Sequence, residues 1–205
     1  MPRPGLLFFV LVISMAATVH IVAQTNPVVQ SCLDPRVDAS SDLDKRIDAC
    51  LRVIGDGIIG HDVRAEAYLR RALAYAQKYG LTNSVQDADR AIADLSDGLR
   101  LDPKNAAGQR YALQMRAGLY YHKGDYDRAL ADYTALLGIE PNSTTFYVYR
   151  AEVFADKGDR QRAIADLTQA IQREPKAGDL YAQRALLYVQ INKLKPRPWQ
   201  MLIMS

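Results

Sequence analysis

An Arg-Ala pair recurs along the chain, and its spacing constrains the fold more than any other feature. The last three copies are 34 residues apart, and an aromatic residue stands three positions after every alanine. The pairs are Arg71-Ala72, Arg116-Ala117, Arg150-Ala151 and Arg184-Ala185, and the aromatic residues are Tyr75, Tyr120, Phe154 and Tyr188. A fixed period of this length predicts stacked copies of one small structural unit.

A second motif, an Ala-x-Ala-Asp phrase, lies between these pairs. It spans 91–95, 129–133 and 163–167, and a proline follows twelve residues past each leading alanine, at Pro103, Pro141 and Pro175. Apolar residues at steps of three and four predict amphipathic helices. Gly124-Asp125 and Gly158-Asp159 predict the end of one helix and a capping carboxylate for the next. The unit is therefore a pair of antiparallel helices.

Over residues 65–192 these columns resemble the tetratricopeptide repeat family, in an exported bacterial form. Gly124-Asp125-Tyr126-Asp127-Arg128-Ala129 and Ile139-Glu140-Pro141-Asn142 carry the likeness most clearly. The resemblance implies an all-α fold: a right-handed superhelical solenoid of antiparallel helix pairs, with about three and a half repeats and an N-terminal capping helix. It also implies a concave groove, lined by the first helix of each pair, in which a partner peptide lies.

Counting from the aromatic columns places ten residues in this partner groove. They are Gln114, Gly118, Tyr121, His122, Val148, Glu152, Ala155, Ala182, Leu186 and Val189. The set is mixed and moderately apolar, which suits an apolar or helical segment of a partner. In the alternative interpretation, Tyr121 and Leu186 only support the superhelix.

Arginines stand where the family usually has an apolar residue. An aspartate also recurs on the second helix, at Asp94, Asp132 and Asp166. We predict that these aspartates pair with Arg71, Arg116, Arg150 and Arg184 between helices, within a repeat or with its neighbour. The alternative is that all these charges face water and pair with nothing, and exposed pairs contribute less than about 1 kcal/mol each.

The first repeat is irregular. Seven extra residues lie between its helices, around Gln77–Gln86, and four more follow Pro103, around Asn105–Gly108. Insertions in repeat proteins map to loops. We therefore expect Gly80 to end the first helix, and Asn83 or Ser84 to cap the second.

The ends of the chain differ from the repeats. Residues 1–23 hold a basic start and an apolar run, which predicts a signal peptide; an uncleaved anchor formed by residues 6–23 is the alternative. We then expect an N-terminal segment with a capping half-repeat helix at 24–61, the solenoid at 62–192, and an irregular apolar tail at 193–205. The tail either folds back over the last helix or marks a truncated form.

Two cysteines, Cys32 and Cys50, lie early in the region after the apolar run. An even count in an exported chain predicts a disulfide. It would fasten an extended segment after the signal to the capping helix at 42–54. The alternative is that Cys50 is a small buried hydrophobic residue on that helix.

The composition and the motifs of the chain argue against several classes of function. Lys and Arg number 26 against 23 Asp and Glu, and the signs alternate closely, so no basic patch for nucleic acid is formed. The sequence lacks a nucleophile elbow, a zinc-binding His-Glu-x-x-His and a phosphate loop. We expect no enzyme activity, cofactor or metal.

The predicted function is that of an adaptor which binds another protein or peptide outside the cytoplasm, in the periplasm or as a secreted protein. The alternative is a structural subunit of an envelope or secretion assembly, which associates through its solenoid ends and apolar tail. Contact with a membrane is expected only through an uncleaved N-terminal segment, and self-association is left open.

Overall fold

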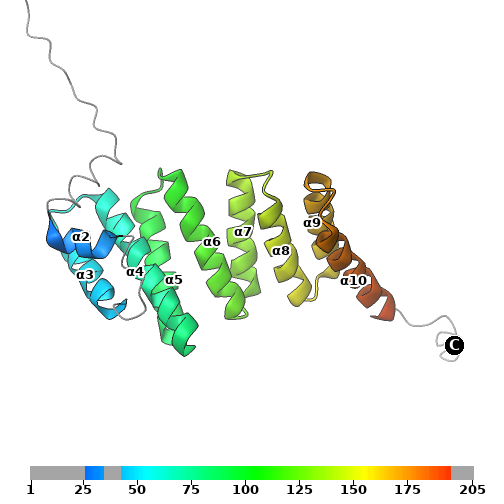
Figure 1. Ribbon diagram of the computed structural model, residues 1–205, viewed down its shortest axis with the longest axis horizontal. Helices are drawn as coiled ribbons and strands as arrows, with labels where there is room; N and C mark the ends of the chain where they lie inside the picture. Colours follow the sequence, from blue (N-terminus) through cyan, green and yellow to red (C-terminus); the bar gives the residue numbers. More distant parts are fainter. Residues whose placement is uncertain (1–25, 35–42, 195–205) are drawn as a thin grey trace, which may run out of the picture. The chain divides into compact units, whose positions relative to one another are not determined.

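The computed structural model describes residues 26–34 and 43–194, and all regular structure within them is helical (Figure 1). The chain divides into two compact units, Met1–Asp102 and Pro103–Ser205. None of the described helices is both long and apolar enough to cross a membrane. The expected signal or anchor at 1–23 and most of the tail at 193–205 lie outside the described residues.

The first unit contains α2 (Pro27–Leu33), α3 (Leu43–Gly55), α4 (His61–Thr82) and α5 (Val85–Leu101). Helix α2 packs on α3 and α4, α3 on α4, and α4 on α5. The expectation of an extended segment around Cys32 was wrong, because residues 27–33 are helical. Asn26 caps this helix by accepting hydrogen bonds from the backbone N–H groups of Val28 and Val29, and Pro27 suits its first turn.

The extra residues of the first repeat lengthen helices instead of forming a loop. Helix α4 continues ten residues past Ala72, whereas α6 continues five past Ala117. Gly80 therefore lies inside α4 and does not end it. The turn comes at Asn83, whose φ of 54° is left-handed, and the Ser84 side chain then caps α5 by accepting from Asp87 N–H at 3.4 Å.

The second unit contains α6 (Ala106–His122), α7 (Tyr126–Ile139), α8 (Thr144–Asp156), α9 (Arg160–Arg173) and α10 (Gly178–Leu194). Each helix packs against the next one in the chain. The four residues after Pro103 also enter a helix: α6 has 17 residues where α8 has 13, and the Asn105 side chain caps it. The expectation of a loop there was wrong, because a capping amide at Asn105 allows the helix to start early.

The turns within the second unit follow the prediction. Gly124 and Gly158 adopt positive φ angles of 75° and 90°, which favour glycine. The carboxylates of Asp125 and Asp159 then accept hydrogen bonds from the third backbone N–H of α7 and α9, at 3.3 and 3.1 Å. These short turns bring consecutive helices back antiparallel, which confirms the predicted helix pairs.

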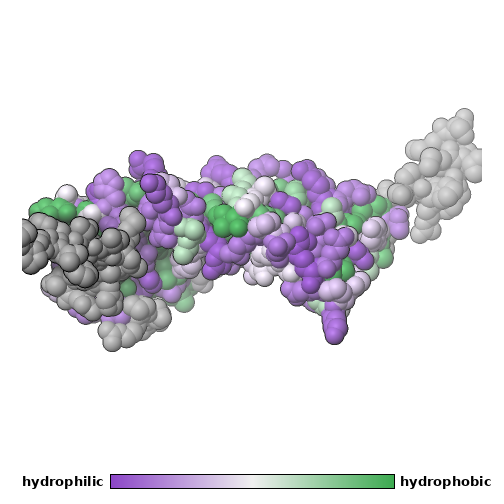
Figure 2. Space-filling model, turned by 90° about the horizontal axis from the view of Figure 1, so that it is seen from above, coloured by the Kyte–Doolittle hydropathy of each residue, from purple (hydrophilic) through white to green (hydrophobic). Residues whose placement is uncertain are grey.

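Alanine seams form the core between paired helices. Ala117 of α6 and Ala129 of α7 are fully buried, as is Ala163 of α9, opposite Ala151 of α8. The aromatic residues of the repeat, Tyr120 and Phe154 among them, fill the space beside these small residues. Outside the seams the described surface seen in Figure 2 is mostly hydrophilic, with small hydrophobic patches between the charged groups.

Candidate protein-binding face

The ten predicted groove residues lie on the first helices of the second unit, and we call them the first-helix face. Helix α6 contributes Gln114, Gly118, Tyr121 and His122; α8 contributes Val148, Glu152 and Ala155; α10 contributes Ala182, Leu186 and Val189. None of the ten is buried, and Leu186 and Val189 are among the most exposed large apolar residues. The face is therefore accessible to a partner.

Gly118 leaves open space in the middle of α6. A Cβ atom added there would meet no atom within 4 Å outside its own helix backbone and chain neighbours. Its φ is not in the left-handed region, so the glycine is not required by the backbone. The bare helix surface at Gly118 can instead be approached closely by another chain.

Tyr121 joins the first helices of two successive repeats. Its hydroxyl donates a hydrogen bond to Asp156 Oδ2 at 2.5 Å, from α6 to the end of α8. This hydrogen bond, with a smaller effect of burial, raises the pKa of Tyr121 to about 12. The Tyr121 ring also lies 6.1 Å from that of Tyr126. The three α10 members of the face take no part in this arrangement.

Acidic and tyrosine side chains gather beside this bond. Glu152 lies one helical turn before Asp156, and burial, followed by the charge of Asp156, raises the pKa of its carboxyl. Tyr149 of α8 packs its ring 5.8 Å from that of Tyr133 of α7. Burial raises the pKa of Tyr133 to about 12. We call Tyr121, Tyr126, Tyr149, Glu152 and Asp156 the tyrosine–acid patch.

Three members of this patch were not predicted from the sequence. Asp156 follows the predicted Ala155 and stands four residues after Glu152, a spacing that puts both acids on one side of a helix. Tyr149 follows the predicted Val148. Tyr126 lies on the second helix, and the counting scheme considered only first helices. The spacing of Glu152 and Asp156 was the one available signal.

The predicted pairing of arginine with aspartate is confirmed in all three complete helix pairs. Nε and Nη2 of each arginine donate to the two oxygens of one carboxylate, at 2.7 to 2.8 Å. The pairs are Arg71–Asp94, Arg116–Asp132 and Arg150–Asp166, and hydrogen bonding to the aspartate raises the pKa of each arginine. The carboxylates are buried, so these charges do not face water.

The arginines also reach the preceding repeat. Arg150 Nη1 donates to Thr134 Oγ1 at 3.1 Å, and Arg184 Nη1 donates to Thr168 Oγ1 at 3.2 Å. Thr134 and Thr168 each stand two residues after the recurring aspartate, so the sequence held this signal. Arg150 therefore connects α9, through Asp166, with α7, through Thr134.

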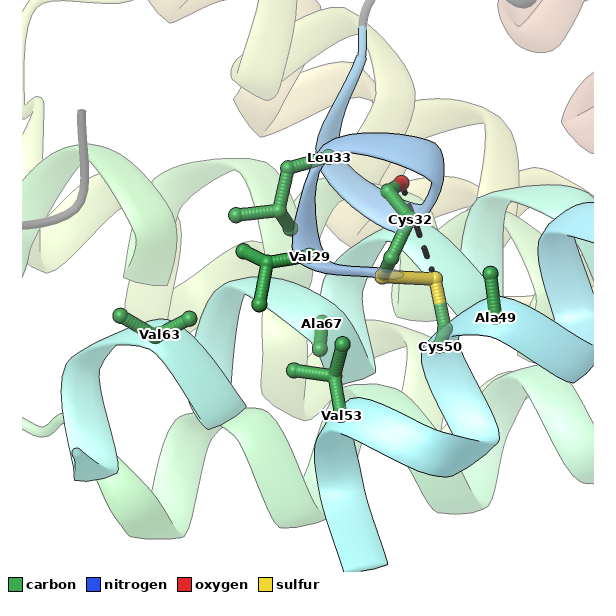
Figure 3. Close-up of a cluster of buried hydrophobic side chains, with 8 residues drawn as sticks. All are labelled: Val29, Cys32, Leu33, Ala49, Cys50, Val53, Val63 and Ala67. Carbon is green, nitrogen blue, oxygen red and sulfur yellow. Dashed lines mark hydrogen bonds between the residues drawn. A yellow bond between two sulfur atoms is a disulfide. The ribbon is translucent and has the colours of Figure 1, made fainter. Parts of the chain in front are cut away.

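In the first unit, Cys32 of α2 and Cys50 of α3 have their sulfur atoms 2.09 Å apart, at disulfide distance (Figure 3). Figure 3 also shows the apolar residues around them: Val29 and Leu33 of α2, Ala49 and Val53 of α3, and Val63 and Ala67 of α4. The cross-link thus lies within an apolar cluster through which α2 packs on α3 and α4. Arg46 adds a hydrogen bond from Nη2 to the carbonyl oxygen of Asp34 at 2.7 Å.

Reactive groups do not converge in the part of the chain that the structure describes. Within residues 26–34 and 43–194, no group of three or more His, Cys, Asp or Glu side chains could hold a metal ion. His61 and His122 are exposed at the ends of α4 and α6. The first-helix face and its tyrosine–acid patch can accept hydrogen bonds, attract cations and pack apolar groups. These are the properties of a binding surface.

The helix pairs and the accessible first-helix face define a helical repeat protein. Residues 111–143 match the model of the tetratricopeptide repeat. This chain therefore contains a tetratricopeptide repeat over these residues, as its recurring columns indicated.

Solved structures of MamA share the fold. MamA from Desulfovibrio magneticus RS-1 aligns with a TM-score of 0.61 and 15% identity, over 85% of this chain and 86% of that one. The MamA structure designated AMB-1 aligns with a TM-score of 0.59 and 15% identity, over 85% and 84% of the two chains. At this identity the likeness concerns the fold alone. No curated protein sequence matches the chain significantly.

Proposed function

We propose that this chain is a non-catalytic binding module, and that a polypeptide partner lies on the first-helix face of the second unit. Repeat proteins use such extended surfaces to bind other chains. The observation that carries the proposal is the tyrosine–acid patch next to the open surface at Gly118. Tyrosine contributes contact area together with a polar tip, which makes it frequent at interfaces.

The patch favours a partner segment that carries basic groups among apolar ones. Glu152 and Asp156 place two carboxylates on one exposed side of α8, whereas Val148 and Ala155 add apolar surface beside them. A lysine or arginine of the partner would relieve the repulsion between these acids, which contributes to the raised pKa of Glu152. Apolar side chains would pack on the tyrosine rings.

A capture experiment from the native envelope tests this function. The wild-type chain is compared with Tyr121→Ala, Glu152→Ala and the control Glu174→Ala, which removes one acid from an exposed position at the end of α9. We expect the wild type and the control to recover the same cross-linked partner, and the two face variants to recover much less. Equal recovery by all four chains would reject the first-helix face as the binding site.

We also propose that the module works outside the cytoplasm, either cleaved from residues 1–23 or held by an anchor at 6–23. Two observations support export: the basic and apolar start of the sequence, and two cysteines at disulfide distance. Fractionation of the host and the mass of the mature chain test the proposal. A chain found in the cytoplasm with its N-terminus intact would contradict it.

The alternative role, a structural subunit joined through its solenoid ends and apolar tail, stays a prediction. Its strongest support is the exposure of Leu186, Tyr188 and Val189 on α10. Light scattering over a range of concentrations distinguishes the two, because self-assembly raises the mean mass and binding of a separate partner does not.

A further inference from the structure

Helix α10 exposes the side on which the earlier first helices pack their second helix. Tyr120 of α6 and Phe154 of α8 are 9% and 8% exposed, whereas Tyr188, at the same repeat position of α10, is 50% exposed. Ala117 and Ala151 are buried in their seams, but Ala185 is exposed. The apolar residues of this side are therefore those that a second helix covers in the other repeats.

Arg184 shows what such a helix would carry. Its Nη1 donates to Thr168 just as Arg150 Nη1 donates to Thr134, so the guanidinium is placed as in the repeat before it. In that repeat the remaining edge of Arg150 binds both oxygens of Asp166. Among the described residues, no carboxylate pairs with Arg184. A guanidinium edge that matches a carboxylate is thus presented beside an open alanine seam.

We propose that this side of α10, defined by Tyr181, Arg184, Ala185 and Tyr188 and called the α10 seam, binds an amphipathic helix of a separate polypeptide. The helix presents small residues to Ala185 and Tyr188 and an aspartate or glutamate to Arg184. It takes the place that α9 takes on α8. This surface is distinct from the first-helix face, and its occupation does not depend on the function proposed above.

Residues 195–205, which follow α10, do not carry the sequence pattern of this helix. In the second unit each paired aspartate stands sixteen positions after its arginine. Gln200 stands sixteen residues after Arg184, and residues 195–205 contain no Asp or Glu. Pro196 and Pro198 are also unsuited to a helix interior. A second copy is a poor donor, because its α7 and α9 already bury their alanines and aspartates in their own repeats.

The test uses a labelled, end-capped peptide of residues 159–174, which copies α9 with its caps, added to the full chain and followed by fluorescence anisotropy. We expect saturable binding to the wild-type chain. The peptide with Asp166→Asn, and the chain with Arg184→Gln, should each bind at least about tenfold more weakly. The control Lys176→Gln removes one charge from the exposed turn before α10 and should bind as the wild type does.

Several results would overturn the proposal. The wild-type chain fails to bind the peptide, or the Asp166→Asn peptide binds as tightly as the original. The comparison of the two peptides stays valid even if Arg184→Gln disturbs folding, because both peptides are tested on the wild-type chain. A mass in light scattering that doubles without peptide, and returns to one copy in Arg184→Gln, would assign the seam to a second copy instead of a separate partner.

Discussion

Arg150 and Asp166 form a two-point ion pair between α8 and α9, with Nε to Oδ2 at 2.7 Å and Nη2 to Oδ1 at 2.8 Å. The same geometry recurs at Arg116–Asp132 and, in the first unit, at Arg71–Asp94. In each case the carboxylate is buried and the arginine is mostly covered. An ion pair thus occupies a position where a repeat of this kind usually has apolar packing.

Breaking one of these pairs should destabilise the second unit. Arg150→Leu leaves the Asp166 carboxylate buried without its counter-charge, which costs about 3 kcal/mol. Adding Asp166→Ala should restore the free energy of unfolding to within about 1 kcal/mol of the wild type, since neither charge is then buried alone. Urea unfolding of the two single variants and the double variant measures this coupling.

Arg100→Gln is the matched control for that series. Arg100 pairs with Asp97 on the exposed side of α5, so its removal should leave the unfolding midpoint unchanged. Additive losses in the Arg150 and Asp166 series, with no recovery in the double variant, would mean that the pair does not act as a unit.

The two glycines Gly80 and Gly124 should respond to alanine in opposite directions. Gly80 lies inside α4 with nothing within 4 Å of an added Cβ, so Gly80→Ala should stabilise by about 0.5 to 1 kcal/mol. Gly124 has a φ of 75°, so Gly124→Ala should destabilise by about 1 kcal/mol. Thermal unfolding of both variants checks the predicted signs. A loss of stability in Gly80→Ala would show that α4 ends at that residue.

These helix ends show how much of the fold could be predicted from the sequence. The spacing of Arg116, Arg150 and Arg184 gave the period, and Gly124-Asp125 gave the turn, because both depend on local chemistry that a sequence displays. Local chemistry did not show whether the extra residues around Gly80 form a loop or lengthen the helices. A glycine ends a helix only where the backbone turns left-handed, and here Asn83 takes that conformation.

The site was predicted less completely than the fold. Counting within the repeat found accessible positions such as Tyr121 and Glu152, but a count along one helix does not show which side chains of neighbouring helices meet. The bond from Tyr121 to Asp156 joins residues 35 positions apart, and it depends on how α6 and α8 are spaced. That spacing is a property of packing, so the contact between Tyr121 and Asp156 came only with the structure.

The disulfide should stabilise the first unit. Closing the loop between Cys32 and Cys50 contributes about 3 kcal/mol in the chain-entropy model. Reductant should therefore lower the unfolding midpoint of the wild type, and it should leave a Cys32→Ala, Cys50→Ala double variant unaffected. Peptide mapping without reductant should recover the two cysteines linked, and two free thiols would dismiss the cross-link.

Stability should fall at high pH. Tyr121 and Tyr133 have pKa values of about 12 in the folded chain, above the value of about 10 for an unfolded tyrosine. A raised pKa favours the protonated phenol in the folded state, so this stabilisation is complete below pH 10 and is lost as the pH rises toward 12. Tyrosinate absorbance of the wild type should include a late-titrating group that is lost in Tyr121→Phe. Unchanged late titration in Tyr121→Phe would contradict the bond to Asp156.

The most direct measurement for a partner on the first-helix face is site-specific photo-crosslinking in the native host. A benzophenone amino acid is placed at Gly118, where side-chain space is open, and at Ala131, which is exposed on α7 outside the face. We predict a cross-linked polypeptide from position 118 that is lost with Glu152→Ala, and little product from position 131. Equal products from both positions, or none from position 118, would contradict it.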